Sequence, residues 1–309
     1  MRMRASGRRL VIAHVLLLLL LGTVLLAPKD RPGLRDSGAL LTAIVLLEGA
    51  FLLAVARQRR RGGPGTAPFD LICLAWVLLL AWEVSTSVLH LAHPVLVPAP
   101  ENVFATFWEQ GDVLILNVLY SLQLLAVGYV LGLALAVVLG LFAGWYPRLR
   151  AFAYPVANVL APIPPIVISP YLVAIMPTFR SASVLVIVLG VFWPNFLGII
   201  NRVADIDPRI LDSARMLQLS GSAMIWKVLL PYLFPGIVGG LKVSLTTSLL
   251  MLNFAELMGA THGMGYYVQN SISYANYAHA VAGMIVIGLV VTALNVLVTR
   301  LQKKLIRWH

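Results

Sequence analysis

The chain has few charged residues and a single cysteine. Charged side chains make up 11% of its 309 residues, whereas about 25% is usual for a soluble domain. Hydrophobic residues make up 60% of the chain, and the mean hydropathy is +0.90. This composition excludes an ordinary soluble domain. Cys73 has no second cysteine to pair with, so an intramolecular disulfide and a metal cluster built on several thiolates are also excluded.

Long apolar runs fill most of the chain. A helix needs about 20 apolar residues to cross the roughly 30 Å hydrocarbon layer of a bilayer. Within lipid every backbone N–H and C=O must be paired inside the segment, so runs of this length are helices rather than isolated strands. We therefore predict an all-α polytopic membrane protein whose spans lie at approximately residues 10–27, 38–56, 70–91, 114–145, 151–176, 182–203, 228–256 and 279–300.

The first apolar run follows the basic stretch MRMRASGRR, which is also how a signal peptide begins. No convincing small-x-small cleavage site precedes Lys29. We interpret the run as a retained helix, with cleavage as the alternative.

Basic residues lie beside the spans rather than in one patch. A net charge of +11 would suit a nucleic-acid partner, but 18 of the 23 lysines and arginines fall on one side of the membrane if the N-terminus is cytoplasmic. The other side holds only Lys29, Arg31, Arg35 and Arg180. This asymmetry follows the positive-inside rule. It predicts that both termini are cytoplasmic and argues against a nucleic-acid partner.

Two breaks divide the chain. The linker RQRRRGGPGTAP at 57–68 separates a two-helix N-terminal extension, residues 1–69, from a core at 70–309. Five prolines between 162 and 177 interrupt another apolar run, and a broken helix at membrane depth needs protein or a water-filled cavity around it. Pro164 and Pro165 are therefore candidates for a translocation pathway, with a simple kinked helix as the alternative.

Glycines recur along the fourth span at 128, 132, 140 and 144. Small residues at this spacing let helix backbones approach closely in membranes. We interpret them as a packing surface rather than a ligand site.

The stretch DPRILDSARMLQLSGSAMIWKVLLP at 207–231 is the longest water-facing passage in the second half of the chain. Asp207 is a suitable N-cap and Pro208 suits the first helical position, so a helix should begin there. The apolar side chains of Ile210, Leu211, Ala214, Leu217 and Leu219 recur at helical spacing. A short polar helix between two spans suits insertion into a groove on a partner.

At this stretch the chain resembles the inner-membrane permeases of binding-protein-dependent ABC importers. Their cytoplasmic signature is E-A-A, three residues, glycine, nine or more residues and an apolar-Leu-Pro ending; here Asp212, Ser213 and Ala214 align with E-A-A, and VLLP closes the motif at Pro231. The stretches PIPPIVISP, AELMGATHGMGYYVQNS and AGMIVIGLV are similar to the nitrate, taurine and alkanesulfonate branch. The resemblance covers about residues 70–309. It implies six core helices, preceded here by two extra ones, in a bacterial inner membrane.

The resemblance also implies how the chain works. The helices at 207–227 would dock on an ATPase, through Arg209, Asp212, Ser213, Ala214, Arg215, Leu217, Gln218 and Gly221. Gln218 stands where the family has glycine, so we expect Gly221 to supply the turn between the two short helices. The expected solute is small and anionic, and the partners are a second permease copy or paralogue, an ABC ATPase dimer, an extracytoplasmic binding protein and the lipid bilayer.

No P-loop of the form G-x-x-x-x-G-K-[ST] occurs in the chain. We therefore expect no enzymatic activity of its own and no bound cofactor, with ATP and Mg on the partner ATPase. The scattered histidines do not suggest a metal site.

Glu256 and Asn253 stand near the outer end of the seventh span. Acids inside a membrane are costly to desolvate and are functional candidates, so these two residues could line the pathway or a gate. A structural hydrogen bond between helices is the alternative. Two other classes stay open: a lipid or prenyl transferase using Asp205 and Asp207, which would need a second acidic cluster, and an ion-coupled secondary transporter, which predicts paired repeats.

Overall fold

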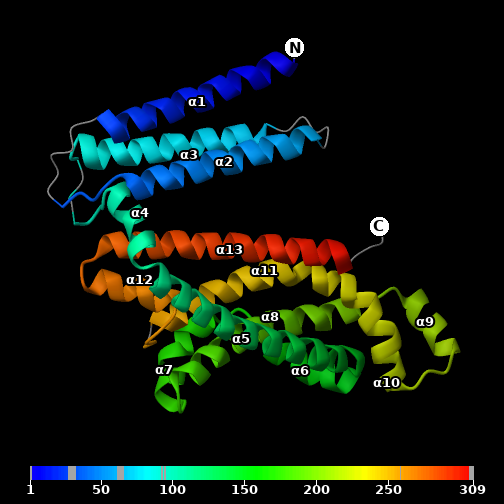
Figure 1. Cartoon of the computed structure of the whole chain (residues 1–309). Coiled ribbons are helices and arrows are strands. Elements are labelled where there is room, and N and C mark those ends of the chain that lie inside the picture. The colour runs from blue at the N-terminus through cyan, green and yellow to red at the C-terminus, as the bar shows by residue number, and fades with distance from the viewer. Residues whose placement is uncertain are drawn as a thin grey trace. The chain divides into compact units, whose positions relative to one another are not determined.

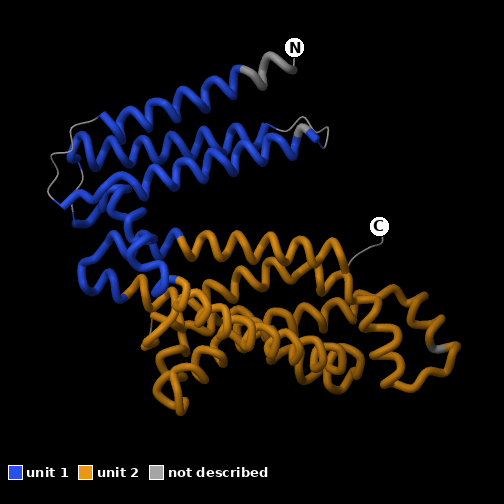
Figure 2. Tube along the Cα trace, viewed as in Figure 1, with its two compact units in different colours: residues 1–114, 270–285 blue, residues 115–269, 286–309 orange. Residues whose placement is uncertain are grey.

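The computed structural model describes residues 2–26, 33–60, 66–91, 93, 95–257 and 259–305, and within these ranges it contains helices and no strand. The all-α prediction is confirmed. The chain divides into two compact units, residues 1–114 with 270–285 and residues 115–269 with 286–309 (Figures 1 and 2). Of the basic residues in the orientation argument, Lys29, Arg31, Arg61 and Arg307 lie outside the described ranges.

Seven helices in the described ranges are long and apolar enough to cross a membrane, and a bent pair makes up to eight. The predicted spans correspond to α1 (Arg2–Leu26), α2 (Gly38–Arg60), α3 (Ala67–Glu83), α5 (Gly111–Trp145), α8 (Phe179–Ala204), α11 (Leu230–Leu257) and α13 (Tyr277–Leu305). The exception is the predicted span at 151–176. It consists of α6 (Pro147–Leu160) and a second piece, Pro165–Ile175, bent by 79° from it. This bend confirms the broken helix rather than a simple kink. The helix breaks here because Pro162, Pro164 and Pro165 lack the backbone N–H groups that would continue α6.

Unit 1 is built on α1, α2 and α3, with the short α4 (Pro100–Glu109). Trp76 of α3 is fully buried in its core, and Phe51 of α2 meets Phe69 of α3 edge to face at 5.5 Å between ring centroids. α3 thus packs with the two N-terminal helices, although it was counted with the core by its position in the sequence. The division at residue 69 stays a prediction.

In unit 2 the glycine stripe of α5 packs against α8. A Cβ added at Gly128 would lie 2.7 Å from the Cβ of Ile187, and one at Gly144 would lie 2.7 Å from the Cβ of Val203. Such distances are far inside van der Waals contact, so only glycine allows the two backbones to approach this closely. The packing interpretation is confirmed.

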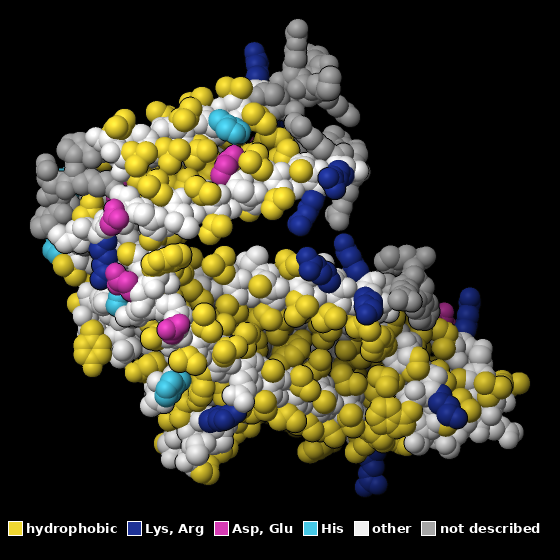
Figure 3. Space-filling model, in the orientation of Figure 1, with side chains coloured by type: hydrophobic (Ala, Val, Ile, Leu, Met, Phe, Trp, Pro, Cys, Tyr) yellow, Lys and Arg dark blue, Asp and Glu magenta, His cyan; other side chains and the backbone are white. Residues whose placement is uncertain are grey.

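One end of unit 2 carries a polar excursion between α8 and α11. It consists of α9 (Pro208–Met216) and α10 (Gly221–Met224), and α10 continues through a π-helical turn at Ile225–Leu229 into α11. The C-terminal ends of α5, α8 and α13 lie toward this end, and most of the Lys and Arg side chains visible on this unit lie there too (Figures 1 and 3). At the other end α7 (Ser169–Ile175) leads into α8, and α12 (Met264–Ser273) follows α11.

Candidate functional site

The N-terminus of α9 is capped as predicted. The carboxylate of Asp207 accepts a hydrogen bond from the backbone N–H of Arg209 at 2.9 Å, and Pro208 is the first helical residue. Ser220 caps α10 in the same way, accepting from the N–H of Ala223 at 3.3 Å. Both short helices therefore begin at positions that local side chains fix.

The inner face of α9 rests on an apolar cluster. Ala214 is 6% exposed and lies in a cluster with Ile199 and Val203 of α8 and Met224 and Ile225 at the start of the α10–α11 helix, with Ile210 and Leu211 packed against it. Burial of this face fixes α9 against the ends of the spanning helices. A force on α9 is therefore passed to α8 and α11 through side-chain contacts.

The outer face of α9 is polar but ends in exposed apolar side chains. Arg209, Asp212 and Ser213 are exposed, while Met216 is 85% and Leu217 is 72% exposed. Leu217, which the sequence counts both among the apolar residues at helical spacing and among the docking residues, lies just after the last residue of α9, Met216, and its docking role stays a prediction. The side chain of Arg215 lies outside the described residues.

The turn between α9 and α10 is made by Gln218. Its φ is +50°, in the left-handed region, whereas Gly221 is not among the glycines with positive φ and is the first residue of α10. The expectation that Gly221 supplies the turn is therefore wrong. The chain needs a left-handed residue right after α9, at the position of the family's glycine, and here glutamine adopts that conformation at a cost of about 1 kcal/mol.

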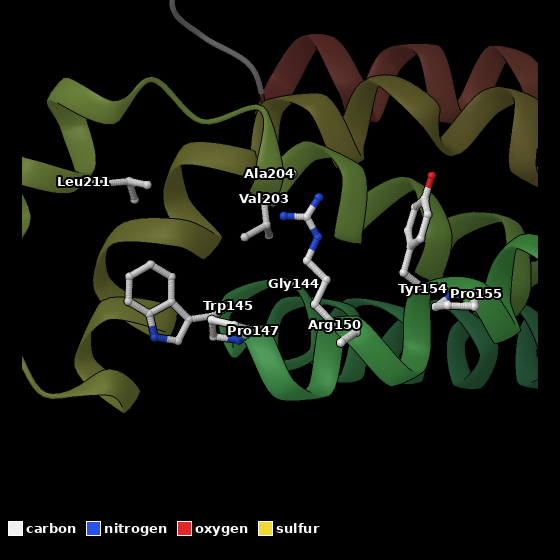
Figure 4. A pocket seen from close by; sticks show the side chains of 10 residues that line it. Gly144, Trp145, Pro147, Arg150, Tyr154, Pro155, Val203, Ala204 and Leu211 are labelled. Carbon is white, nitrogen blue, oxygen red and sulfur yellow. The ribbon is translucent and has the colours of Figure 1, made fainter.

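A pocket of about 490 Å³ borders α9 (Figure 4). Its walls come from the C-terminal ends of α5 and α8 and from α6, and α9 contributes Leu211. Arg150 of α6 extends into it toward Val203 of α8. α9 is thus packed through part of its inner face and borders an open space elsewhere.

Glu256 and its neighbours form a buried polar network at the opposite end of unit 2. Glu256 is 1% exposed. Its carboxylate accepts from the hydroxyl of Ser121 on α5 at 2.6 Å and from the backbone N–H of Gly265 on α12 at 2.8 Å. The Ser121 hydroxyl accepts from the N–H of Met264 at 2.9 Å, and Asn117 accepts from that of Gly263 at 2.7 Å. Of the two interpretations of Glu256, the contacts favour the structural hydrogen bond over the pathway.

Three consecutive backbone N–H groups, at residues 263 to 265, are held by side chains of α5 and α11 in this network. Two of these groups, at residues 264 and 265, begin the helix α12. Burial raises the pKa of Tyr267 on this helix to about 12, so its hydroxyl stays protonated.

The other pathway candidates do not converge on one cavity. Pro164 is exposed and Pro165 is buried at the break after α6. The side-chain amide of Asn253 donates to the carbonyl of Leu249 at 2.9 Å, within its own helix. Within the described ranges, no three His, Cys, Asp or Glu side chains are placed to hold a metal ion.

Sequence reasoning missed polar side chains near the middle of α8 and α11. The side-chain amide of Asn195 donates to the hydroxyl of Ser244 at 3.0 Å, and both line a pocket together with Thr247. The signal was present, since an asparagine directly after a proline inside an apolar span is costly in lipid.

The sequence matches the family model described as binding-protein-dependent transport system inner membrane component over residues 136–308, more than half of the chain. A protein of Bacillus subtilis (strain 168), named for aliphatic sulfonates transport, is 28% identical over 241 residues, covering 77% of this chain and 87% of that permease. A taurine transport system permease of Escherichia coli (strain K12) is 26% identical over 250 residues, covering 76% and 88%. A nitrate import permease of Synechococcus elongatus is 27% identical over 229 residues, covering 70% and 81%.

Proposed function

The chain belongs to the family of binding-protein-dependent transport system inner membrane components and is a transport permease, and from that membership we propose that α9 and α10 are the element through which a separate ABC ATPase drives it. The family and the relatives are transport proteins, so neither the prenyl transferase nor the ion-coupled transporter is supported.

The arrangement of α9 carries this proposal. A short helix with a polar outer face and the exposed apolar pair Met216 and Leu217 offers both charge and apolar area to a groove on a partner. Its inner face contacts α8 and the α10–α11 helix, so movement of the docked ATPase is transmitted to two spanning helices. The adjoining pocket gives α9 space to shift.

The remaining partners follow from the same membership. A second permease, identical or paralogous, completes the pathway, and a binding protein delivers solute from outside. Both termini lie in the cytoplasm of a bacterium, because the basic residues Arg148, Arg150, Arg202 and Lys227 lie at the α9 end of unit 2 and Arg180 at the other end. We propose a small oxyanion as solute, since sulfonates, taurine and nitrate, which the similar permeases are named for, share such a group.

Charge reversal on α9 tests the docking. In membranes that contain the permease and its partner ABC ATPase, Arg209→Glu should reduce co-purification of the ATPase and abolish the stimulation of ATP hydrolysis by loaded binding protein. Arg180→Glu is the control, because Arg180 is also exposed and lies in the first turn of α8 at the opposite end of unit 2. If both variants keep the ATPase equally well, the docking surface is not on α9.

A further inference from the structure

A groove lies between α8 and α11, about halfway along both helices. It has a volume of about 230 Å³. At about 1.5 Å of rise per residue, Asn195 is about 14 Å from the end of α8 at Ala204 and about 24 Å from its start, which places it within the hydrocarbon layer. The groove is lined mainly by Gly190, Pro194 and Asn195 of α8 and Gly240, Ser244 and Thr247 of α11.

Neutral polar groups line this groove. The amide nitrogen of Asn195 donates to the carbonyl of Val191 at 2.7 Å and to the hydroxyl of Ser244 at 3.0 Å. Pro194 lies inside α8 and has no N–H, so it cannot donate to the carbonyl of Gly190 one turn earlier. The hydroxyl of Thr247 adds another polar group one turn after Ser244. The groove therefore offers hydrogen-bonding groups and no charge.

The small residues of the groove are not packed like those of the α5 stripe. A Cβ added at Gly240 would meet nothing within 4 Å, and one at Gly190 would make only ordinary contacts, 3.4 Å to Met251 and 3.5 Å to Pro165. The polar side chain of Thr247 on the lining is exposed, as is Val243 at 73%. Polar groups exposed to lipid tails are costly. The groove therefore fits a surface that faces water or a second protein chain in the membrane.

We propose that this groove holds the oxyanion group of the solute during its passage, through the amide of Asn195 and the hydroxyls of Ser244 and Thr247. The inference rests on the proposed transport function and assigns the solute contact to residues other than Asn253 and Glu256. Sulfonate and nitrate present several acceptor oxygens. To bind them, the amide of Asn195 and the hydroxyl of Thr247 exchange their present acceptors, the Ser244 hydroxyl and the Val243 carbonyl, for a solute oxygen. With no cation in the groove the solute is held weakly, as a site on a transport pathway requires.

Neighbouring threonines of α11 provide a matched test. Thr246 and Thr247 each donate to the carbonyl four residues earlier, at 3.0 and 3.1 Å, but the Thr246 hydroxyl also meets Asn295 of α13 at 3.3 Å. Valine has nearly the same shape as threonine and removes only the hydroxyl. Uptake of taurine, nitrate and ethanesulfonate would be measured in proteoliposomes that contain the complete transporter and its binding protein, together with stimulated ATP hydrolysis.

Thr247→Val should reduce uptake by about tenfold, the equivalent of one hydrogen bond to a charged group, while binding protein still stimulates ATP hydrolysis. Thr246→Val should stay within about twofold of the parent. Equal uptake by the two variants overturns the groove assignment. A parent complex that takes up none of the three solutes, or that shows no ATP hydrolysis coupled to binding protein, overturns the proposed function instead.

Cysteine labelling gives a second measurement that does not depend on turnover. Cys73→Ser removes the single native thiol. In that background Thr247→Cys should react with a sulfonate-bearing methanethiosulfonate reagent, more slowly in the presence of the transported solute, and Thr246→Cys should react at least about tenfold more slowly because α13 covers it. Equal reactivity at the two positions, or no protection by solute at residue 247, contradicts the proposal.

Discussion

The two ends of unit 2 use polar residues in opposite ways. At the α9 end the side chain of Arg209 is exposed, and the other face of the helix packs through Ala214 and its neighbours. At the α12 end the polar side chains point inward, and Glu256 and Ser121 bind backbone N–H groups of the segment after α11. The first arrangement presents a charged side chain to a partner, and the second uses polar side chains to fix the chain itself. Substitutions at the α12 end should therefore change stability, and those on the outer face of α9 should change association.

The largest effect is expected at Gly265. An added Cβ would collide with the backbone carbonyl of Asn253, and backbone cannot move aside as a long side chain does. Gly265→Ala should lower the free energy of unfolding in detergent by about 2–3 kcal/mol. Gly198→Ala, where an added Cβ meets nothing within 4 Å, is the control and should leave the thermal unfolding midpoint nearly unchanged. A similar midpoint for both variants would show that the α11–α12 junction is loosely packed.

Removal of the Glu256 carboxylate should cost somewhat less. Glu256→Ala leaves the hydroxyl of Ser121 and the N–H of Gly265 without their buried acceptor, which costs about 1–3 kcal/mol. Thermal unfolding measures this loss. If the variant is as stable as the parent but its uptake of solute is impaired, Glu256 is a pathway residue and not a structural one.

Substitutions at two leucines, one within α9 and one just after it, should distinguish effects on ATPase binding from effects on the stability of the permease. Leu217 is exposed and Leu211 packs against the cluster under α9. Leu217→Ser should weaken ATPase binding by about 1–2 kcal/mol with unchanged thermal stability, because only the docked state buries this side chain. Leu211→Ser should instead lower the thermal unfolding midpoint of the permease itself, because this side chain packs in the folded protein. The comparison between the two ends fails if Leu217→Ser destabilises the isolated permease.

The smallest effect is expected at Gln218. Glycine adopts a positive φ without strain, so Gln218→Gly should stabilise the turn by about 0.5–1 kcal/mol. Gln218→Ala is the control, since alanine is strained there as well and should not stabilise. Hydrogen exchange of the backbone amides at 216–221 measures the difference. Equal protection in the two variants would mean that the left-handed turn is not populated.

Much of this fold follows from the sequence. Apolar length located the seven unbroken spans, prolines located the break after α6, and Asp207 located the start of α9. These predictions succeed because each depends on local chemistry: the length of a run, a missing N–H, or a side-chain cap. The docking role of α9, the solute and the domain boundary at residue 69 stay predictions.

Sequence reasoning failed where contacts between distant segments determine the conformation or the partner of a residue. The preference of glycine for positive φ suggested Gly221, but the path from α9 to α10 requires the left-handed residue at Gln218. Likewise, no spacing rule connects Glu256 with Ser121, which are 135 residues apart in the chain.

The sequence by itself determined that this protein is a helical membrane permease with a water-facing element between two spans, because hydrophobic length, charge asymmetry and a short signature are all local properties. The tertiary structure decided which polar groups are used internally and which stay available. That decision depends on which helices meet: α5 and α11 enclose Glu256, whereas α8 and α11 leave an open groove at Asn195 and Thr247. The cost of burying a polar group depends on its neighbours, and these are known only once the helices are packed.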